Sequence, residues 1–241
     1  MCIRDRAHTA AKETGIKLLI GAEVTPDDAP PVLLWATNRA AYGRLSRLIT
    51  VGRRRAPKGE CQTSLSDIAE HAEGLIAGVC PTMTTPNQAT DNKATNNGTI
   101  TNPINAGTAR KPTLDTYHQY RDIFGDRSYL MLELLCGPQD YLRLEQLQSL
   151  SQQTQLPLVA AGDVHYHIPE RLVLHDVLQA IRNGITVDRL SELPDRFANA
   201  QRHLRPIDEI NRVYASEPAA IERTVSIARQ CSFSLLSLIH I

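Results

Sequence analysis

The chain has 241 residues, 42% apolar and 22% charged, which suits a globular protein with a sizeable core and excludes a disordered tail or a fibre. Its 26 Lys and Arg balance 26 Asp and Glu, so the net charge is zero and any contact with nucleic acid must be local. Five scattered cysteines without a CxxC pair indicate free thiols, as expected in the cytoplasm. No apolar run reaches the roughly 18 to 20 residues that span a bilayer, so we expect no membrane contact.

Helices and strands are predicted to alternate over the first 80 residues. Helices are expected over 7–15, 38–52 and 65–71, and strands over 17–24, 31–36 and 74–80. Gly15 suits a helix end and Asn38 a helix N-cap. Gly52 is expected to stop the second helix, which makes the basic residues after it a loop.

The second half of the chain repeats this alternation after a change in composition. Residues 81–112 are rich in Thr and Asn, and we expect a flexible insertion there. Further helices are expected over 113–124, 138–153, 169–184 and 217–231, and strands over 128–135 and from 156 into the polar residues that end at 167. The helix from 169 carries an apolar stripe expected to face inward, formed by Leu174, Val177, Leu178 and Ile181. Repeated strand and helix units favour an α/β fold with a parallel sheet or a βα barrel.

The expected loop after Gly52 concentrates positive charge. Arg53, Arg54, Arg55 and Lys58 lie within six residues. Such a cluster can contact DNA phosphates or acidic residues of a neighbouring domain. A merely solvated loop is the alternative.

The strongest chemical pattern is Asp163-Val164-His165-Tyr166-His167, at the end of a buried strand. If the strand geometry continues, Asp163, His165 and His167 project from one face because side chains alternate along a strand. Glu23 ends the first apolar strand, and the carboxyl ends of strands are where α/β folds build sites. These N and O donors suit Zn, Mn or Fe, while capping and surface hydrogen bonding remain the plainer interpretation.

Several separated segments resemble one family. GAEV, WATNRAAYGRLSRLITVGRRRAPKGEC and LPLVAAGDVHYH resemble the polymerase and histidinol phosphatase (PHP) domain at the N-terminus of bacterial C-family DNA polymerases. AGDVHYH, ELLCGPQD, GRRRAPKGE and QRHLRP resemble the error-prone branch of that family. The resemblance runs from about Ala7 to Leu235 outside the insertion. It implies a distorted βα barrel of the PHP type, incomplete at its N-terminus, with a metal cluster at the carboxyl ends of its strands.

The resemblance also implies roles for single residues. Glu23, Asp163 and His165 match ligand positions for Zn or Mn, and His167 and Cys136 are further candidates. The chain departs from the family pattern in having neither a His-x-His strand nor an Asp-His motif before Glu23. Cys136 stands in a segment where family members carry a histidine, and a buried packing thiol is its alternative role.

The resemblance divides the chain as follows. Residues 7–200 are expected to be the PHP domain, 201–235 a helical connection toward a polymerase core, and 1–6 and 236–241 non-native ends. The parent protein is then expected to add nucleotides to a DNA template during translesion synthesis and repair, using Mg in a core absent from this chain. Its partners would be DNA and the other domains of the same polymerase. This chain would hold no catalytic polymerase residue.

Two other functions are compatible with the same residues. One is a stand-alone, metal-dependent PHP phosphoesterase similar to histidinol phosphatase. The other is a catalytically silent scaffold module. The polymerase-like segments around the basic cluster and at QRHLRP argue against a small-molecule phosphatase.

Overall fold

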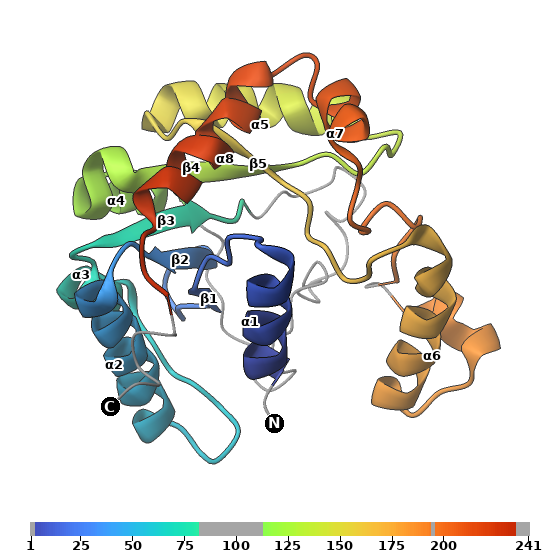
Figure 1. Cartoon of the computed structure of the whole chain (residues 1–241), viewed down its shortest axis with the longest axis horizontal. Helices are drawn as coiled ribbons and strands as arrows, with labels where there is room; N and C mark the ends of the chain where they lie inside the picture. Colours follow the sequence, from blue (N-terminus) through green and yellow to red (C-terminus); the bar gives the residue numbers. More distant parts are fainter. Residues whose placement is uncertain (1–2, 82–112, 194–195, 235–241) are drawn as a thin grey trace. The chain divides into compact units, whose positions relative to one another are not determined.

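The computed structural model describes residues 3–81, 113–193 and 196–234 (Figure 1). The expected insertion, apart from Pro81, and the closing residues 236–241 lie outside this part of the chain. The strands are β1 (Gly21–Val24), β2 (Val32–Ala36), β3 (Leu75–Val79), β4 (Ser128–Glu133) and β5 (Leu158–Ala161). The helices are α1 (Ile3–Thr14), α2 (Arg39–Arg55), α3 (Leu65–His71), α4 (Leu114–Phe124), α5 (Asp140–Thr154), α6 (Leu172–Asn183), α7 (Ile207–Val213) and α8 (Pro218–Gln230). The predicted α/β class is therefore confirmed.

The strands of the described chain form one open, mixed sheet in the order β1-β2-β3-β4-β5 (Figure 1). β1 pairs antiparallel with β2 and β2 antiparallel with β3, whereas β4 and β5 are parallel. The expectation of parallel strands was thus wrong for the first three. Only residues 25–31 join β1 to β2, and a parallel pair needs a crossover of a dozen residues or more. Closure of the sheet into a PHP-type barrel stays a prediction.

The described residues divide into two compact units. The first unit comprises residues 3–80, 113–129 and 225–234, and the second comprises 81, 130–193 and 196–224. Strand β4 and helix α8 each pass from one unit into the other. The predicted division into 7–200 and 201–235 remains a prediction.

In the first unit, helices pack on the antiparallel strands. All five residues of β3 are buried, and both α2 and α4 contact this strand. Tyr120 of α4 is fully buried and donates its hydroxyl to the carbonyl of Pro30 at 2.6 Å, so its one polar atom is satisfied. At the N-terminus of α2, the Asn38 side chain accepts a hydrogen bond from Ala41 N at 2.9 Å, which confirms the predicted helix cap.

Helix α2 does not end at Gly52 as predicted but continues to Arg55. A Cβ at residue 52 would meet Thr63 Cγ2 at 2.6 Å and Cys61 Sγ at 2.7 Å, so glycine serves the close approach of the 61–63 segment. Arg53, Arg54 and Arg55 therefore form the last helical turn instead of a loop, where positive charge favours the helix dipole.

In the second unit, β4 and β5 are largely buried, with α5 against β5. Helix α6 begins after a 3-10 turn at Pro169–Arg171 and ends at Gly184 with φ 64°, as its sequence predicted. Its apolar stripe does not face inward: Leu174 is 46% exposed, Leu178 56% and Ile181 71%. Ala180 is its only buried residue in the described structure, so the inward stripe was a wrong prediction.

The expected apolar faces of two other helices are also only partly buried. In α5, Leu147 is buried but Tyr141 is 79% exposed, and in α8 Val225 is 47% exposed. Helix α7 lies within the 201–235 region that was expected to be helical, although its own bounds were not predicted. Ile207, Ile210 and Val213 recur at every third residue, but seven residues are too few for periodicity to mark the ends of a helix.

Candidate functional site

The expected metal ligands fall in both units. Glu23 lies on β1 of the first unit, exposed and opposite Leu33 of β2. Asp163, His165, His167 and Cys136 belong to the second unit.

Asp163 and His165 come together. Asp163 Oδ1 lies 3.3 Å from His165 Nε2, and their side chains are 30% and 23% exposed. Strand β5 ends before them, at Ala161, and Asp163 has a φ of 41°, outside the extended region. Asp tolerates this left-handed conformation better than most residues. The strand alternation that would place His167 beside them therefore stops before Asp163.

The backbone after Asp163 is held by the 202–204 segment. Arg202 O accepts from His165 N at 2.9 Å, Leu204 N donates to Tyr166 O at 3.1 Å, and Tyr166 and His203 form a parallel bridge. Two segments almost 40 residues apart thus fix the direction in which Asp163 and His165 project.

Arg202 also contacts the expected site with its side chain. Its Nε lies 2.6 Å from Asp163 Oδ2, and its guanidinium lies 4.1 Å from the centre of the Phe197 ring. The Phe197 ring stacks with His175 at 4.3 Å and meets the edge of His165 at 4.9 Å. This cation and aromatic cluster surrounds the carboxylate with protein groups.

The cluster changes the acidity of its members. Burial opposes ionisation of Asp163, but hydrogen bonds from His165 and Arg202 outweigh it and lower the pKa of the carboxyl group. Burial, together with the nearby His165, lowers the pKa of His175. At neutral pH the cluster therefore has an ionised Asp163 beside a cationic Arg202 and a neutral His175.

Glu133, at the carboxyl end of β4, is a site residue that the sequence reasoning missed. Burial raises the pKa of its carboxyl group, against the opposing effect of Arg143, whose Nη2 lies 3.4 Å away. Asp163 also raises this pKa, so the two carboxylates share one electrostatic neighbourhood. The position of Glu133 at the end of an apolar strand was the signal that could have identified it.

Tyr214, just after α7, ties the ends of β4 and β5 together. Its hydroxyl lies 2.6 Å from Ala161 O and 3.1 Å from Leu132 O, and it accepts from Leu134 N at 3.3 Å. The residue is 3% exposed. The buried Tyr214 hydroxyl thus joins the end of β4, which carries Glu133, to the end of β5, which precedes Asp163.

Cys136 and His167 do not join the cluster. Both are exposed, and Cys136 has a φ of 52°, so the expectation of a buried packing thiol is not met. Within the described part of the chain, no group of three or more His, Cys, Asp or Glu side chains is placed to hold a metal ion. Since a guanidinium already holds the carboxylate of Asp163, the described residues around it do not fit a divalent cation.

The basic residues of the first unit divide into two kinds. Arg55 pairs with the buried Asp67 at 2.5 Å, inside the capping box of α3 that Ser64 and Asp67 form. Arg53, Arg54 and Lys58 are exposed. Three of the four predicted cations are therefore open to a partner, and one is used within the fold.

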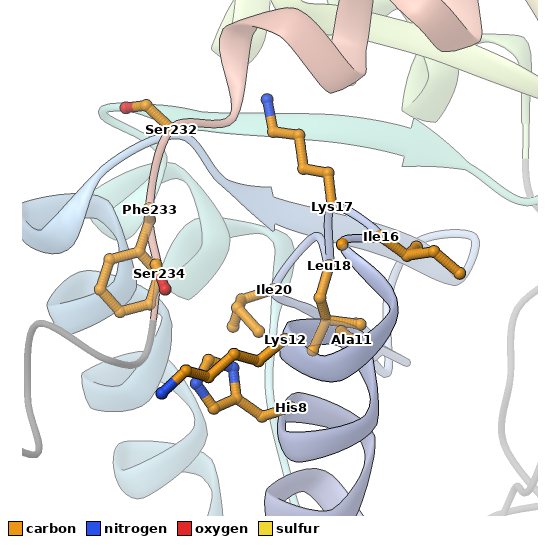
Figure 2. Close-up of a pocket in the computed structure, with 11 residues that line it drawn as sticks. His8, Ala11, Lys12, Ile16, Lys17, Leu18, Ile20, Ser232, Phe233 and Ser234 are labelled. Carbon is orange, nitrogen blue, oxygen red and sulfur yellow. The ribbon is translucent and has the colours of Figure 1, made fainter.

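A hollow lies in the first unit, between α1 and the segment after α8 (Figure 2). Its volume is about 320 Å³, and its walls include His8, Lys12, Leu18, Ile20 and Phe233. Figure 2 shows the Lys17 ammonium directed away from His8 and Lys12, and this group donates to the carbonyl of Ala228. Among the described residues, no carboxylate lines the pocket.

Comparison with known proteins identifies the relatives of this chain. An error-prone DNA polymerase of Rhodopirellula baltica is 40% identical over 230 residues, which cover 95% of this chain and 19% of the relative. Error-prone DNA polymerase 1 of Agrobacterium fabrum is 34% identical over 98% of the chain and 19% of its own length. The chain is related to error-prone DNA polymerases.

Other relatives agree with this relationship. The error-prone DNA polymerase of Pseudomonas syringae pv. syringae is 36% identical over 95% of the chain and 20% of the relative. The chain thus spans about a fifth of the length of the error-prone DNA polymerases that it matches. No family model matches the chain. In the described residues, no helix has both the length and the apolar character needed to cross a membrane.

Proposed function

We propose that this chain is the PHP-domain segment of an error-prone C-family DNA polymerase and that its own role is structural support of the polymerase. The observation that carries the proposal is similarity to error-prone DNA polymerases along 95% or more of the chain, combined with coverage of about a fifth of their length. A segment of that size is a domain of the larger protein. The distorted PHP barrel, with residues 201–235 leading toward the core, is part of this proposal.

The parent protein adds nucleotides to a DNA template, across lesions and during repair, in the cytoplasm. The magnesium ions that assist this reaction belong to the polymerase core, outside the chain described here. DNA and the remaining domains of the same polypeptide are the partners. This chain alone then extends no primer.

The charge distribution supports a contact role for one surface. Arg53 and Arg54 extend from the last turn of α2, and Lys58 follows in the next loop, all three exposed. Exposed cations this close together suit DNA phosphates or an acidic face of a neighbouring domain. Arg55 is left out of this role because its guanidinium is paired with Asp67.

The state of Asp163 favours support over hydrolysis. Glu23, Asp163 and His165 stand at positions where the PHP family places Zn or Mn ligands. In this chain Arg202 holds the Asp163 carboxylate, and hydrolysis through a metal-bound water needs that carboxylate free. His167 and Cys136 add no contact that favours hydrolysis.

Long-read sequencing of the source DNA tests the proposal. We expect the reading frame to continue in both directions beyond the matched region and to reach the length of the relatives. A start codon with a ribosome-binding site just before Met1 and a stop codon after Ile241 would contradict it.

A phosphatase assay on the purified chain is the second test. We expect no hydrolysis of p-nitrophenyl phosphate with Mn²⁺ or Zn²⁺ above a His165→Ala control. Metal-dependent turnover that this substitution removes would support a stand-alone phosphoesterase instead.

A further inference from the structure

Both carboxylate oxygens of Asp163 are engaged by protein groups. Oδ2 lies 2.6 Å from Arg202 Nε, a charge-assisted contact, and Oδ1 lies 3.3 Å from His165 Nε2. A divalent ion would have to displace the guanidinium or bind beside it. Two cations on one carboxylate repel each other strongly where water is partly excluded.

Arg202 is fixed in this position by more than its ion pair. Its side chain is only 12% exposed, and its guanidinium lies over the Phe197 ring. Its carbonyl accepts from His165 N and Tyr166 N, so its main chain is tied to the segment that carries Asp163. An arginine held at both backbone and guanidinium loses little entropy in forming the ion pair, unlike a surface arginine.

Aromatic rings pack against the two side chains that contact Asp163, those of Arg202 and His165. His175 stacks on Phe197 with the ring planes 10° apart, and His165 meets the edges of both rings. Asp176 and Arg196, 3.5 Å apart, form a separate ion pair next to His175. The side chains that contact the Asp163 carboxylate are therefore those of Arg202 and His165, and the carboxylate in turn raises the pKa of Glu133.

We propose that Arg202 is a built-in cation that takes the place of a divalent ion at Asp163, so that the Asp163–Arg202 pair is a structural clamp between the 163–166 and 202–204 segments. The clamp keeps Asp163 in its left-handed conformation at the end of β5. This inference goes beyond the polymerase role and holds whether or not the parent protein copies DNA.

A double-mutant cycle on the full 241-residue chain tests the clamp. The variants are Arg202→Gln, Asp163→Asn and the pair together; asparagine is chosen because it tolerates a positive φ as well as aspartate does. We expect each single change to lower the thermal unfolding midpoint by about 3 to 10 °C and the double variant to lose no more than the larger single loss. Arg189→Gln, which removes a surface pair with Glu192, is the matched control and should change the midpoint little.

Metal addition to the wild-type chain, with Asp163→Asn as the comparison, is the second test. We expect the thermal unfolding midpoint of the wild-type chain to stay unchanged with equimolar Zn²⁺, with equimolar Mn²⁺ and with an excess of EDTA. In calorimetry, the wild-type chain and Asp163→Asn should give the same result on metal addition. Additive losses in the cycle would overturn the proposal. Binding of one Zn²⁺ or Mn²⁺ per wild-type chain that Asp163→Asn abolishes would overturn it equally. Because neither readout involves nucleotide addition, failure here leaves the polymerase assignment standing.

Discussion

The hydroxyl of Tyr214 is expected to stabilise the second unit through the strand ends that it joins. Tyr214→Phe removes one oxygen that makes contacts with Ala161 O, Leu132 O and Leu134 N. The ring can stay in place, because phenylalanine has the same shape. The loss therefore reports the hydrogen bonds and not a cavity.

The size of this loss follows from the burial of the site. A buried polar group left without a partner costs about 1 to 3 kcal/mol, and a typical net hydrogen bond contributes about 1 kcal/mol. The contact with Ala161 O is short, and the residue is 3% exposed. We therefore expect Tyr214→Phe to lower the free energy of unfolding by about 2 kcal/mol.

Urea denaturation followed by circular dichroism measures this difference. Tyr141→Phe is the control, because Tyr141 is 79% exposed on α5 of the same unit and should change the free energy by less than about 0.5 kcal/mol. If the two variants lose the same amount, the clamp at the strand ends is not the source of stability and the reasoning is refuted.

Three further predictions concern the packing, charge and exposed surface of the fold. Gly52→Ala should lower the free energy of unfolding by about 1 to 3 kcal/mol, because the new methyl group meets Thr63 at 2.6 Å; unchanged denaturant stability would show that the segment yields freely. The ion pair with Arg55 lowers the pKa of Asp67, so its stabilisation is complete above about pH 4 and is lost as the pH falls through the lower folded value. Asp67→Asn should flatten this acid dependence in melting curves, and an unaltered curve would contradict it. Ile181→Lys should leave the free energy of unfolding within about 0.5 kcal/mol of wild type in denaturant titrations, whereas a large loss of stability would mean that the α6 stripe is buried.

The features predicted correctly from sequence depend on near neighbours. Asn38 caps α2 through an amide three residues away, and Gly184 ends α6 through its own positive φ. The buried strands were found because short apolar runs between turn residues leave few alternatives. These signals are local, so a single sequence carries them.

The features predicted wrongly depend on distant parts of the chain. Gly52 was taken for a helix stop because its contact with the 61–63 loop is not visible in the local pattern. The direction of β1 relative to β2 was predicted wrongly because the seven residues between them, 25–31, form a short link and not a crossover. The α6 stripe has the periodicity of a buried face, and periodicity alone does not say whether a partner covers it.

The candidate site shows the same division. Asp163 and His165 are two residues apart, and their proximity was expected. The group that binds Asp163 most closely, Arg202, lies 39 residues further along the chain, and no spacing rule predicts that contact. The sequence thus indicated the carboxylate and left its partner undetermined.

Primer extension tests the central claim most directly. Primer extension on a template that carries an abasic site would be measured for two proteins. One is encoded by the complete reading frame that contains residues 7–235, and the other is the 241-residue chain. The account predicts that the complete protein extends primers past the lesion and that this chain extends none. Failure of the complete protein to add nucleotides, or extension by this chain alone, would contradict it.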